Sequence, residues 1–160
     1  MKYIGYGVFH NITNCRELPH LFDGAVLDKI EKWILWGGYN LEKLDYTFEN
    51  CQMRSIDPYL FQNCPKVTSM LHAFHRCDRL EEIPQGLFDY MTNLKNVDTC
   101  FKSCVKLKKV PYNLFNKCPN INNFSSCFCG GGAIGGDVAY PSNMNITSSL
   151  PPAWITHPNA

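Results

Sequence analysis

Aromatic residues recur along the chain at an almost fixed spacing. Their positions, 13 or 14 residues apart, are Phe48, Phe61, Phe74, Phe88, Phe101, Phe115 and Phe128. A second apolar position follows three residues later and holds, in order, Cys51, Cys64, Cys77, Met91, Cys104 and Cys118. Self-similarity at a fixed period indicates a repeat architecture. The sequence therefore predicts a stack of short repeated units.

Alternate aromatics stand in two sequence contexts, so the repeating unit is a pair of steps, as from Phe48 to Phe74 or from Phe74 to Phe101. One context carries proline before the aromatic residue, as in residues 56–61, 83–88 and 110–115. The other occupies residues 44–48, 70–74, 97–101 and 124–128. A unit of this size cannot bury its own apolar face, whereas stacked copies share one continuous core. Each coil of the predicted solenoid thus has two apolar arms.

Two stretches of the chain resemble a known repeat. A leucine-rich repeat is resembled by LEEIPQGLFD at residues 80–89, together with LKNV at 94–97. The BspA-like variety of this repeat is resembled by FHRCDRL at 74–80. In that variety, aromatic-x-x-Cys replaces the usual leucine and asparagine turn. The resemblance implies an α/β solenoid with one short strand of a parallel sheet in each coil. These strands are expected near Leu44–Phe48, Met70–Phe74, Val97–Phe101 and Phe124–Phe128. The expected division is 1–40 for a partial repeat and cap, 41–128 for the leucine-rich repeats and 129–160 for a Gly-rich loop and a divergent terminal repeat.

The N-terminal region departs from the ladder. Residues 18–22 look like the proline-containing arm of an earlier coil, but the chain from Phe22 to Phe48 covers two steps of the ladder where one is expected. We therefore predict an insertion from Asp23 to Asn40. The apolar residues of this segment share one helical face. Asp23 suits the N-cap of a helix and two glycines suit its C-terminal end, so the segment is predicted to form a short amphipathic helix. The apolar residues of that face are Val26, Ile30, Trp33 and Ile34. We expect this helix to cap the core, with a partner-binding or membrane-surface helix as the alternative.

The C-terminal region is interrupted by glycines at 130–136, which predict a turn or bulge in an irregular segment. Residues 150–159 then align with 110–120 through their proline and aromatic positions. A repeat that stops there leaves apolar surface and a sheet edge to be covered. We expect either a longer polypeptide or docking of this end on another subunit through Leu150 and Trp154.

Charge and hydropathy exclude two classes of partner. A net charge of +1 and a pI near 7.5 give no electrostatic reason for binding nucleic acid. No segment reaches transmembrane length, so membrane insertion is not expected. The first residues show no uninterrupted apolar run followed by a cleavage site, so no export signal is expected.

The cysteines mostly occupy the ladder that also accepts Met91, which cannot form a disulfide. We therefore expect reduced, buried thiols that pack as small hydrophobic side chains. Neighbours in one column, such as Cys77 and Cys104, would lie within bridging reach, so oxidation is possible without being required.

Candidate chemistry is sparse. His72, His75 and Cys77 cluster in the sequence, but Cys77 belongs to the core ladder and no second pair of zinc ligands matches it. The five histidines stand in no nucleophile motif. We therefore expect no catalytic residue, no cofactor and no metal. A metal-dependent enzyme using His72, His75 and Cys77 is the alternative from a different functional class.

The exposed positions of the predicted sheet are the remaining candidate for function. In leucine-rich folds these positions form a broad binding face. One such column holds Lys43, Ser69, Asn96 and Asn123, and the other holds Tyr46, His72, Thr99 and Ser126. The next column is small, which suits an inward position, and holds Thr47, Ala73, Cys100 and Cys127. The exposed set is neutral and rich in hydrogen-bonding groups, as suits a protein or glycan partner.

We therefore predict a non-enzymatic recognition or assembly module. The favoured setting is a structural or decorating component of a larger assembly such as a phage virion. Because members of the resembled family are typically bacterial surface proteins implicated in adhesion, a cell-surface adhesin module is the alternative.

Overall fold

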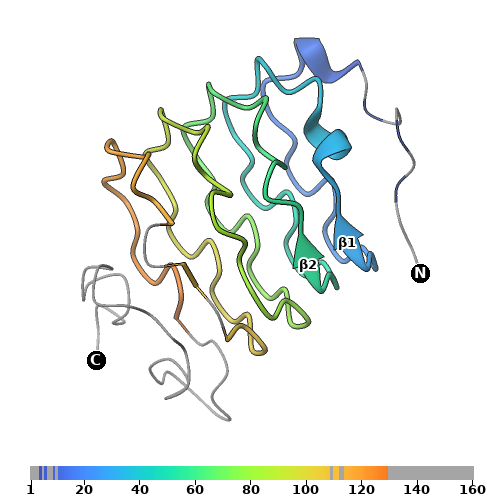
Figure 1. Ribbon diagram of the computed structural model, residues 1–160, viewed down its shortest axis with the longest axis vertical. Helices are drawn as coiled ribbons and strands as arrows, with labels where there is room; N and C mark the ends of the chain where they lie inside the picture. Colours follow the sequence, from blue (N-terminus) through green and yellow to red (C-terminus); the bar gives the residue numbers. More distant parts are fainter. Residues whose placement is uncertain are drawn as a thin grey trace.

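The computed structural model describes residues 4, 6, 9, 11–108, 110–111 and 114–129. Its coils lie side by side in chain order, from the N-terminal coil in blue to the last described coil in orange (Figure 1). The regular elements are the 3-10 helices η1 (Ile12–Asn14) and η2 (Lys32–Leu35) and the strands β1 (Lys29–Ile30) and β2 (Ser55–Ile56). The expected turn at 130–136 and the docking residues Leu150 and Trp154 lie outside the described residues.

The short parallel sheet lies on the proline-containing arm. Strand β1 pairs with β2 in parallel register, Lys29 beside Ser55 and Ile30 beside Ile56. On the other arm, where four strands were expected, the coils are joined by isolated parallel bridges. These bridges are Glu17 to Lys43, Lys43 to Ser69, Ser69 to Asn96 and Asn96 to Asn123. The prediction of a solenoid with a small parallel sheet is confirmed, but the arm chosen for its strands was wrong.

Left-handed residues explain why the expected strands do not form. Tyr46, His72, Thr99 and Ser126 all have φ between 52° and 59°. A residue in this region turns the chain out of the extended conformation that a strand requires. The arm is therefore a run of tight turns, each placed directly beneath the equivalent turn of the next coil.

Backbone hydrogen bonds alternate along these turns. In the coil that contains Phe48, every second amide donates to a carbonyl of the next coil, over 2.8–3.0 Å, from Leu44, Tyr46, Phe48 and Asn50. The amides between them donate to carbonyls three residues back, from Thr47, Glu49 and Cys51. The same scheme recurs in the following coils. Buried amides must be paired, so this alternation lets the arm bury its backbone without a strand.

The core contains two columns of phenylalanine rings. One column stacks Phe22, Phe48, Phe74, Phe101 and Phe128 with centroid distances of 5.1–5.5 Å and nearly parallel planes. The other contains Phe61, Phe88 and Phe115. Edge-to-face contacts join the columns, for example Phe88 against Phe101 at 6.2 Å and 83°. The predicted inward column of Thr47, Ala73, Cys100 and Cys127 is fully buried.

The thiols pack inside this core and are free. All nine cysteines are unbridged, and only Cys15 is not buried. Thiols of the ladder donate to phenylalanine carbonyls of the preceding coil, Cys77 to Phe48 at 3.2 Å and Cys104 to Phe74 at 3.1 Å. Burial raises the pKa of Cys51 and of Cys64 to about 12. The expectation of reduced cysteines used as small buried side chains agrees with this arrangement.

The N-terminal capping helix is not formed. The segment 23–40 is no insertion, because Phe22 stacks on Phe48 as Phe48 stacks on Phe74, and so belongs to the same column one full repeat earlier. The residues that follow complete an ordinary coil, with strand β1 and helix η2 where the α-helix was expected. Leu35 occupies the position of Phe61 and is fully buried. Gly38 occupies the position of Cys64 and lies against its sulfur. Because this arm has leucine and glycine in place of the aromatic residue and the cysteine, a search for aromatic and cysteine positions did not detect it.

Candidate interaction face

The first predicted column forms one continuous ladder. Lys43, Ser69, Asn96 and Asn123 are bridged in sequence, each to the next coil. Side-chain bonds run along this ladder. Ser69 Oγ donates to Asp45 Oδ1 at 2.6 Å, Asn96 Nδ2 donates to Ser69 Oγ at 3.3 Å, and Lys43 pairs with Glu17 at 2.8 Å. Ser69 and Asn96 are half-buried, so Lys43 and Asn123 are the members that are exposed.

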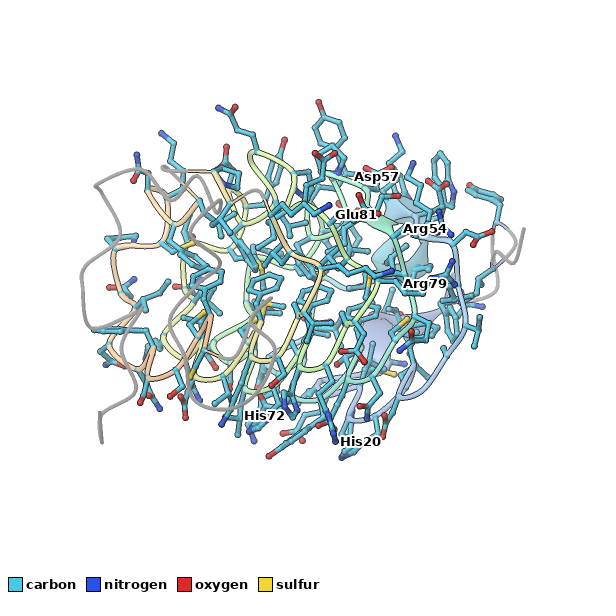
Figure 2. All side chains as sticks on the ribbon, turned by 90° about the horizontal axis from the view of Figure 1, so that it is seen from below. His20, Arg54, Asp57, His72, Arg79 and Glu81 are labelled. Atoms are coloured by element: carbon cyan, nitrogen blue, oxygen red, sulfur yellow. The ribbon has the colours of Figure 1, made fainter. Side chains whose placement is uncertain are left out.

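The second predicted column is an aromatic stack at its N-terminal end. The ring of Tyr46 lies between the rings of His20 and His72, with centroids 4.9 Å away on each side and interplanar angles of 16° and 10°. Figure 2 shows His20 and His72 on the opposite side of the coils from Asp57 and Glu81. Thr99 continues the column and is half-buried.

Ser126 departs from the expectation of an exposed column. Only 5% of its surface is accessible. Its backbone is left-handed like that of Tyr46, His72 and Thr99, so the burial of Ser126 does not come from its backbone conformation. The accessible part of this column accordingly ends at Thr99 among the described residues.

A cluster of imidazoles and carboxylates adjoins the aromatic stack. His75 Nδ1 lies 2.8 Å from Glu49 Oε1, and the rings of His72 and His75 meet edge to face at 4.8 Å. On the far side of Glu49, His20 Nδ1 lies 3.3 Å from Asp23 Oδ2 and 3.8 Å from Glu49 Oε2. Burial, with a further contribution from His75, lowers the pKa of His72.

Glu49 was missed by the sequence reasoning, although a signal for it exists. Glu49 follows Phe48 and His75 follows Phe74, so the two residues are one repeat apart and occupy the same position in adjacent coils. The cluster therefore arises from stacking and not from a local motif. Cys77, expected beside the histidines, is fully buried and its thiol is bonded to a backbone carbonyl.

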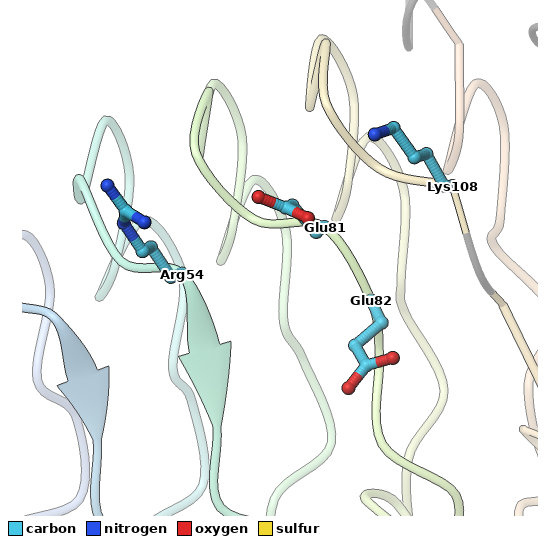
Figure 3. Close-up of a pocket in the computed structure, with 4 residues that line it drawn as sticks. All are labelled: Arg54, Glu81, Glu82 and Lys108. Carbon is cyan, nitrogen blue, oxygen red and sulfur yellow. The ribbon is translucent and has the colours of Figure 1, made fainter.

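A second surface feature lies on the proline-containing side. A depression of about 320 Å³ is lined by Arg54, Glu81, Glu82 and Lys108. Arg54, Glu81 and Lys108 come from three successive coils, so charges of alternating sign follow one another along the stack (Figure 3). The amide of Lys108 donates to the carbonyl of Glu81 at 2.8 Å, which places these two residues side by side in adjacent coils. These four lining residues include no nucleophile paired with a base.

Parallel coils that repeat at this period around a shared apolar core define a leucine-rich-repeat solenoid. A family model described as the BspA type leucine rich repeat region matches residues 1–122 with six copies. The chain belongs to this family, and the resemblance seen in residues 74–97 is confirmed.

A solved structure supports the fold. The APL1 leucine-rich repeat domain is similar with a TM-score of 0.57 and 18% identity, over 82% of this chain and 32% of that one. This chain therefore spans about a third of the length of that structure. The LRIM1/APL1C complex matches with a TM-score of 0.35 and 15% identity, over 66% of this chain and 25% of that one, and we draw no conclusion from it. The comparison with curated proteins gave no match. Among the described residues, no helix has the length and apolar character needed to cross a membrane.

Proposed function

We propose that this protein is a non-enzymatic recognition module that binds a protein partner through the face built by Lys43, Tyr46, Ser69, His72, Asn96, Thr99 and Asn123. The observation that carries the proposal is the bridged register from Glu17 to Asn123, which aligns equivalent side chains of successive coils on one surface. Proteins with leucine-rich repeats commonly bind other proteins, and the family membership of this chain supports that class of function.

The chemistry of the face favours a polar protein surface. The stacked, half-buried side chains of Tyr46 and His72 supply aromatic surface, while Lys43 and Asn123 supply exposed hydrogen-bonding groups. Aromatic side chains flanked by polar groups are typical of protein interfaces. A glycan is the second ligand class, because the exposed polar groups of this face can also form hydrogen bonds with sugar hydroxyls.

Two biological settings are proposed. In the first, the partner is another subunit of a larger assembly, such as a phage virion. In the second, the chain is part of a bacterial cell-surface adhesin, a setting with which the BspA-type family is compatible.

A matched pair of charge reversals tests the face. Lys43→Glu changes an exposed lysine on the face, and Lys106→Glu makes the same change at an exposed lysine outside it. Immobilised wild-type protein, the two charge-reversal variants and Tyr46→Ala are incubated with extracts of the producing cells and of phage-infected cells, and the retained proteins are identified by mass spectrometry. A partner retained by wild type and by Lys106→Glu, but lost from Lys43→Glu and Tyr46→Ala, supports the proposal. Equal retention by all four proteins refutes it, and binding to a glycan array alone assigns the face to sugars.

A further inference from the structure

The strongest unassigned chemistry in the described residues lies beside the interaction face. Glu49 from one coil and His72 and His75 from the next each offer one ligand atom, and these atoms lie within 4.8 Å of one another. All three residues are half-buried, so the cluster is shielded and yet reachable from solvent. Imidazole and carboxylate are ligands that suit zinc and neighbouring first-row metals.

His72 is not satisfied by its present contacts. Its Nδ1 atom is buried and has no hydrogen-bond partner, and it shares this condition, among the described side chains, only with Asp98 Oδ1. Stacking on Tyr46 accounts for the ring position but not for the unpaired nitrogen. Buried polar atoms normally have hydrogen-bond partners, so an unpaired nitrogen within a group of potential metal ligands indicates a site for a bound ion.

Charged side chains of both signs surround His72. Glu49 and Asp98 act on it with negative charge, and Lys102 acts with positive charge. The cluster thus combines two imidazoles and a carboxylate, with the carboxylate of Asp98 and the ammonium group of Lys102 nearby.

We propose that Glu49, His72 and His75 form a binding site for a divalent first-row transition-metal ion such as Zn²⁺. In a tetrahedral zinc site with bonds of about 2.0–2.2 Å, ligand atoms stand about 3.3 Å apart, so the present spacing requires only small side-chain rotations. The ion would replace the hydrogen bond between His75 and Glu49. A tetrahedral ion held by these three ligands would keep a fourth position for water or for a side chain of a partner.

The site joins adjacent coils, which distinguishes it from a metal enzyme built on His72, His75 and Cys77. Cys77 cannot take part, because its buried thiol is bonded to the carbonyl of Phe48. Glu49 supplies the third ligand from the preceding coil. A bound ion would therefore clamp two coils at the edge of the proposed face, and the site does not depend on whether that face binds a partner.

Four conservative variants test the assignment. His72→Asn removes the imidazole with a residue that tolerates the left-handed backbone at φ 55°. Glu49→Gln removes the charge and keeps a hydrogen-bond acceptor for His75. Thr99→Asn is the matched control, since Thr99 holds the position of His72 in the next coil, at φ 52°. His20→Gln tests the exposed group of His20, Asp23 and Glu49, which offers a competing cluster.

The full chain is stripped of metal with a chelator, and zinc chloride is titrated calorimetrically while circular dichroism monitors the fold. One zinc per chain is expected for wild type, Thr99→Asn and His20→Gln, with affinity at least about tenfold weaker, a change of about 1.4 kcal/mol, in His72→Asn and Glu49→Gln. Cobalt substitution should give visible absorption bands that His72→Asn loses. Absence of saturable binding to wild type overturns the proposal, as does loss of zinc in His20→Gln with retention in His72→Asn. If His72→Asn fails to fold, the folded Glu49→Gln variant decides the outcome by the same criterion.

Discussion

The rings of Phe74 and Phe101 lie parallel, with their centroids 5.1 Å apart and an interplanar angle of 4°. Both side chains are fully buried, and Phe101 also contacts Phe88 and Phe128. Each ring of this column thus packs against the equivalent rings of the preceding and the following coil. Removal of one ring therefore removes packing contacts in both neighbouring coils.

Phe101→Ala should lower the free energy of unfolding by about 3–5 kcal/mol, because it removes a buried ring from the middle of the column and leaves a cavity. Urea denaturation followed by circular dichroism measures the change. Tyr59→Ala is the control, since Tyr59 is 49% exposed and its loss should cost far less. Similar losses for both variants would contradict a stacked core.

Gly38→Ala should destabilise the first coils. A Cβ atom at Gly38 would lie 2.9 Å from Cys64 Sγ, 2.9 Å from the carbonyl oxygen of Leu35 and 2.9 Å from Leu41 Cδ1. Overpacking of this kind costs about 1–3 kcal/mol. The thermal unfolding midpoint of the variant measures the effect.

The control for this prediction is the effect of Gly38→Ala in protein that already carries Cys64→Ala. Removing the sulfur relieves one of the three contacts, so Gly38→Ala should cost less there than in wild type. Equal costs in the two backgrounds would show that Gly38 and Cys64 are not packed together.

Thr99→Asn should stabilise the protein. Thr99 is a β-branched residue at φ 52°, a conformation that asparagine adopts far more readily. We expect a gain of about 1 kcal/mol in the free energy of unfolding, measured by urea denaturation. Thr99→Val, which keeps the β-branch, should not produce this gain, and a gain in both variants would indicate a cause other than backbone strain.

The thiols should resist modification in the folded protein. Eight of the nine cysteines are buried, and Cys15 is half-buried. A thiol-reactive disulfide reagent at neutral pH should therefore label Cys15 first and the others only as fast as the coils open. Denatured protein should release nine equivalents. Rapid labelling of several thiols in the native protein would contradict the buried ladder.

Stability should fall as the pH rises above about 9. Burial raises the pKa of Cys51, Cys64 and Cys118 from 9.0 to about 12, so the folded state holds these protons while the unfolded state releases them. Their contribution is complete below the unfolded pKa and is lost between about pH 9 and 12, by up to about 1.4 kcal/mol per pH unit for each thiol. Urea midpoints at pH 8, 9 and 10 measure the slope. Cys64→Ala should show a shallower slope than wild type, and a midpoint independent of pH would exclude this linkage.

The repeat period predicted which side chains meet. Lys43, Ser69, Asn96 and Asn123 were aligned from the sequence, and the structure bridges them in that order. The arrangement is predictable because stacking copies of nearly equal length puts equivalent positions one above the other, whatever the local backbone does. Their role in binding stays a prediction.

The N-terminal coil shows where this reasoning failed. The search used aromatic and cysteine side chains as markers, whereas the core requires only apolar volume at each position. Leu35 and Gly38 meet that requirement, and Gly38 does so because Cys64 and Leu41 fill the space beside it. The helical spacing of apolar residues in 23–40 arose by coincidence, because the segment contains core positions from two arms of one coil.

By itself, then, the sequence determined the length of the coil, the residues that face inward and the register between neighbours, because burial of apolar side chains enforces all three. Only the tertiary structure decided that one arm is made of left-handed turns, since turns and strands can present the same pattern of buried and exposed side chains. The tertiary structure also brought His72 beside Glu49 and His75, because His72 occupies a different position of the repeat and this contact depends on side-chain directions that the period alone does not specify.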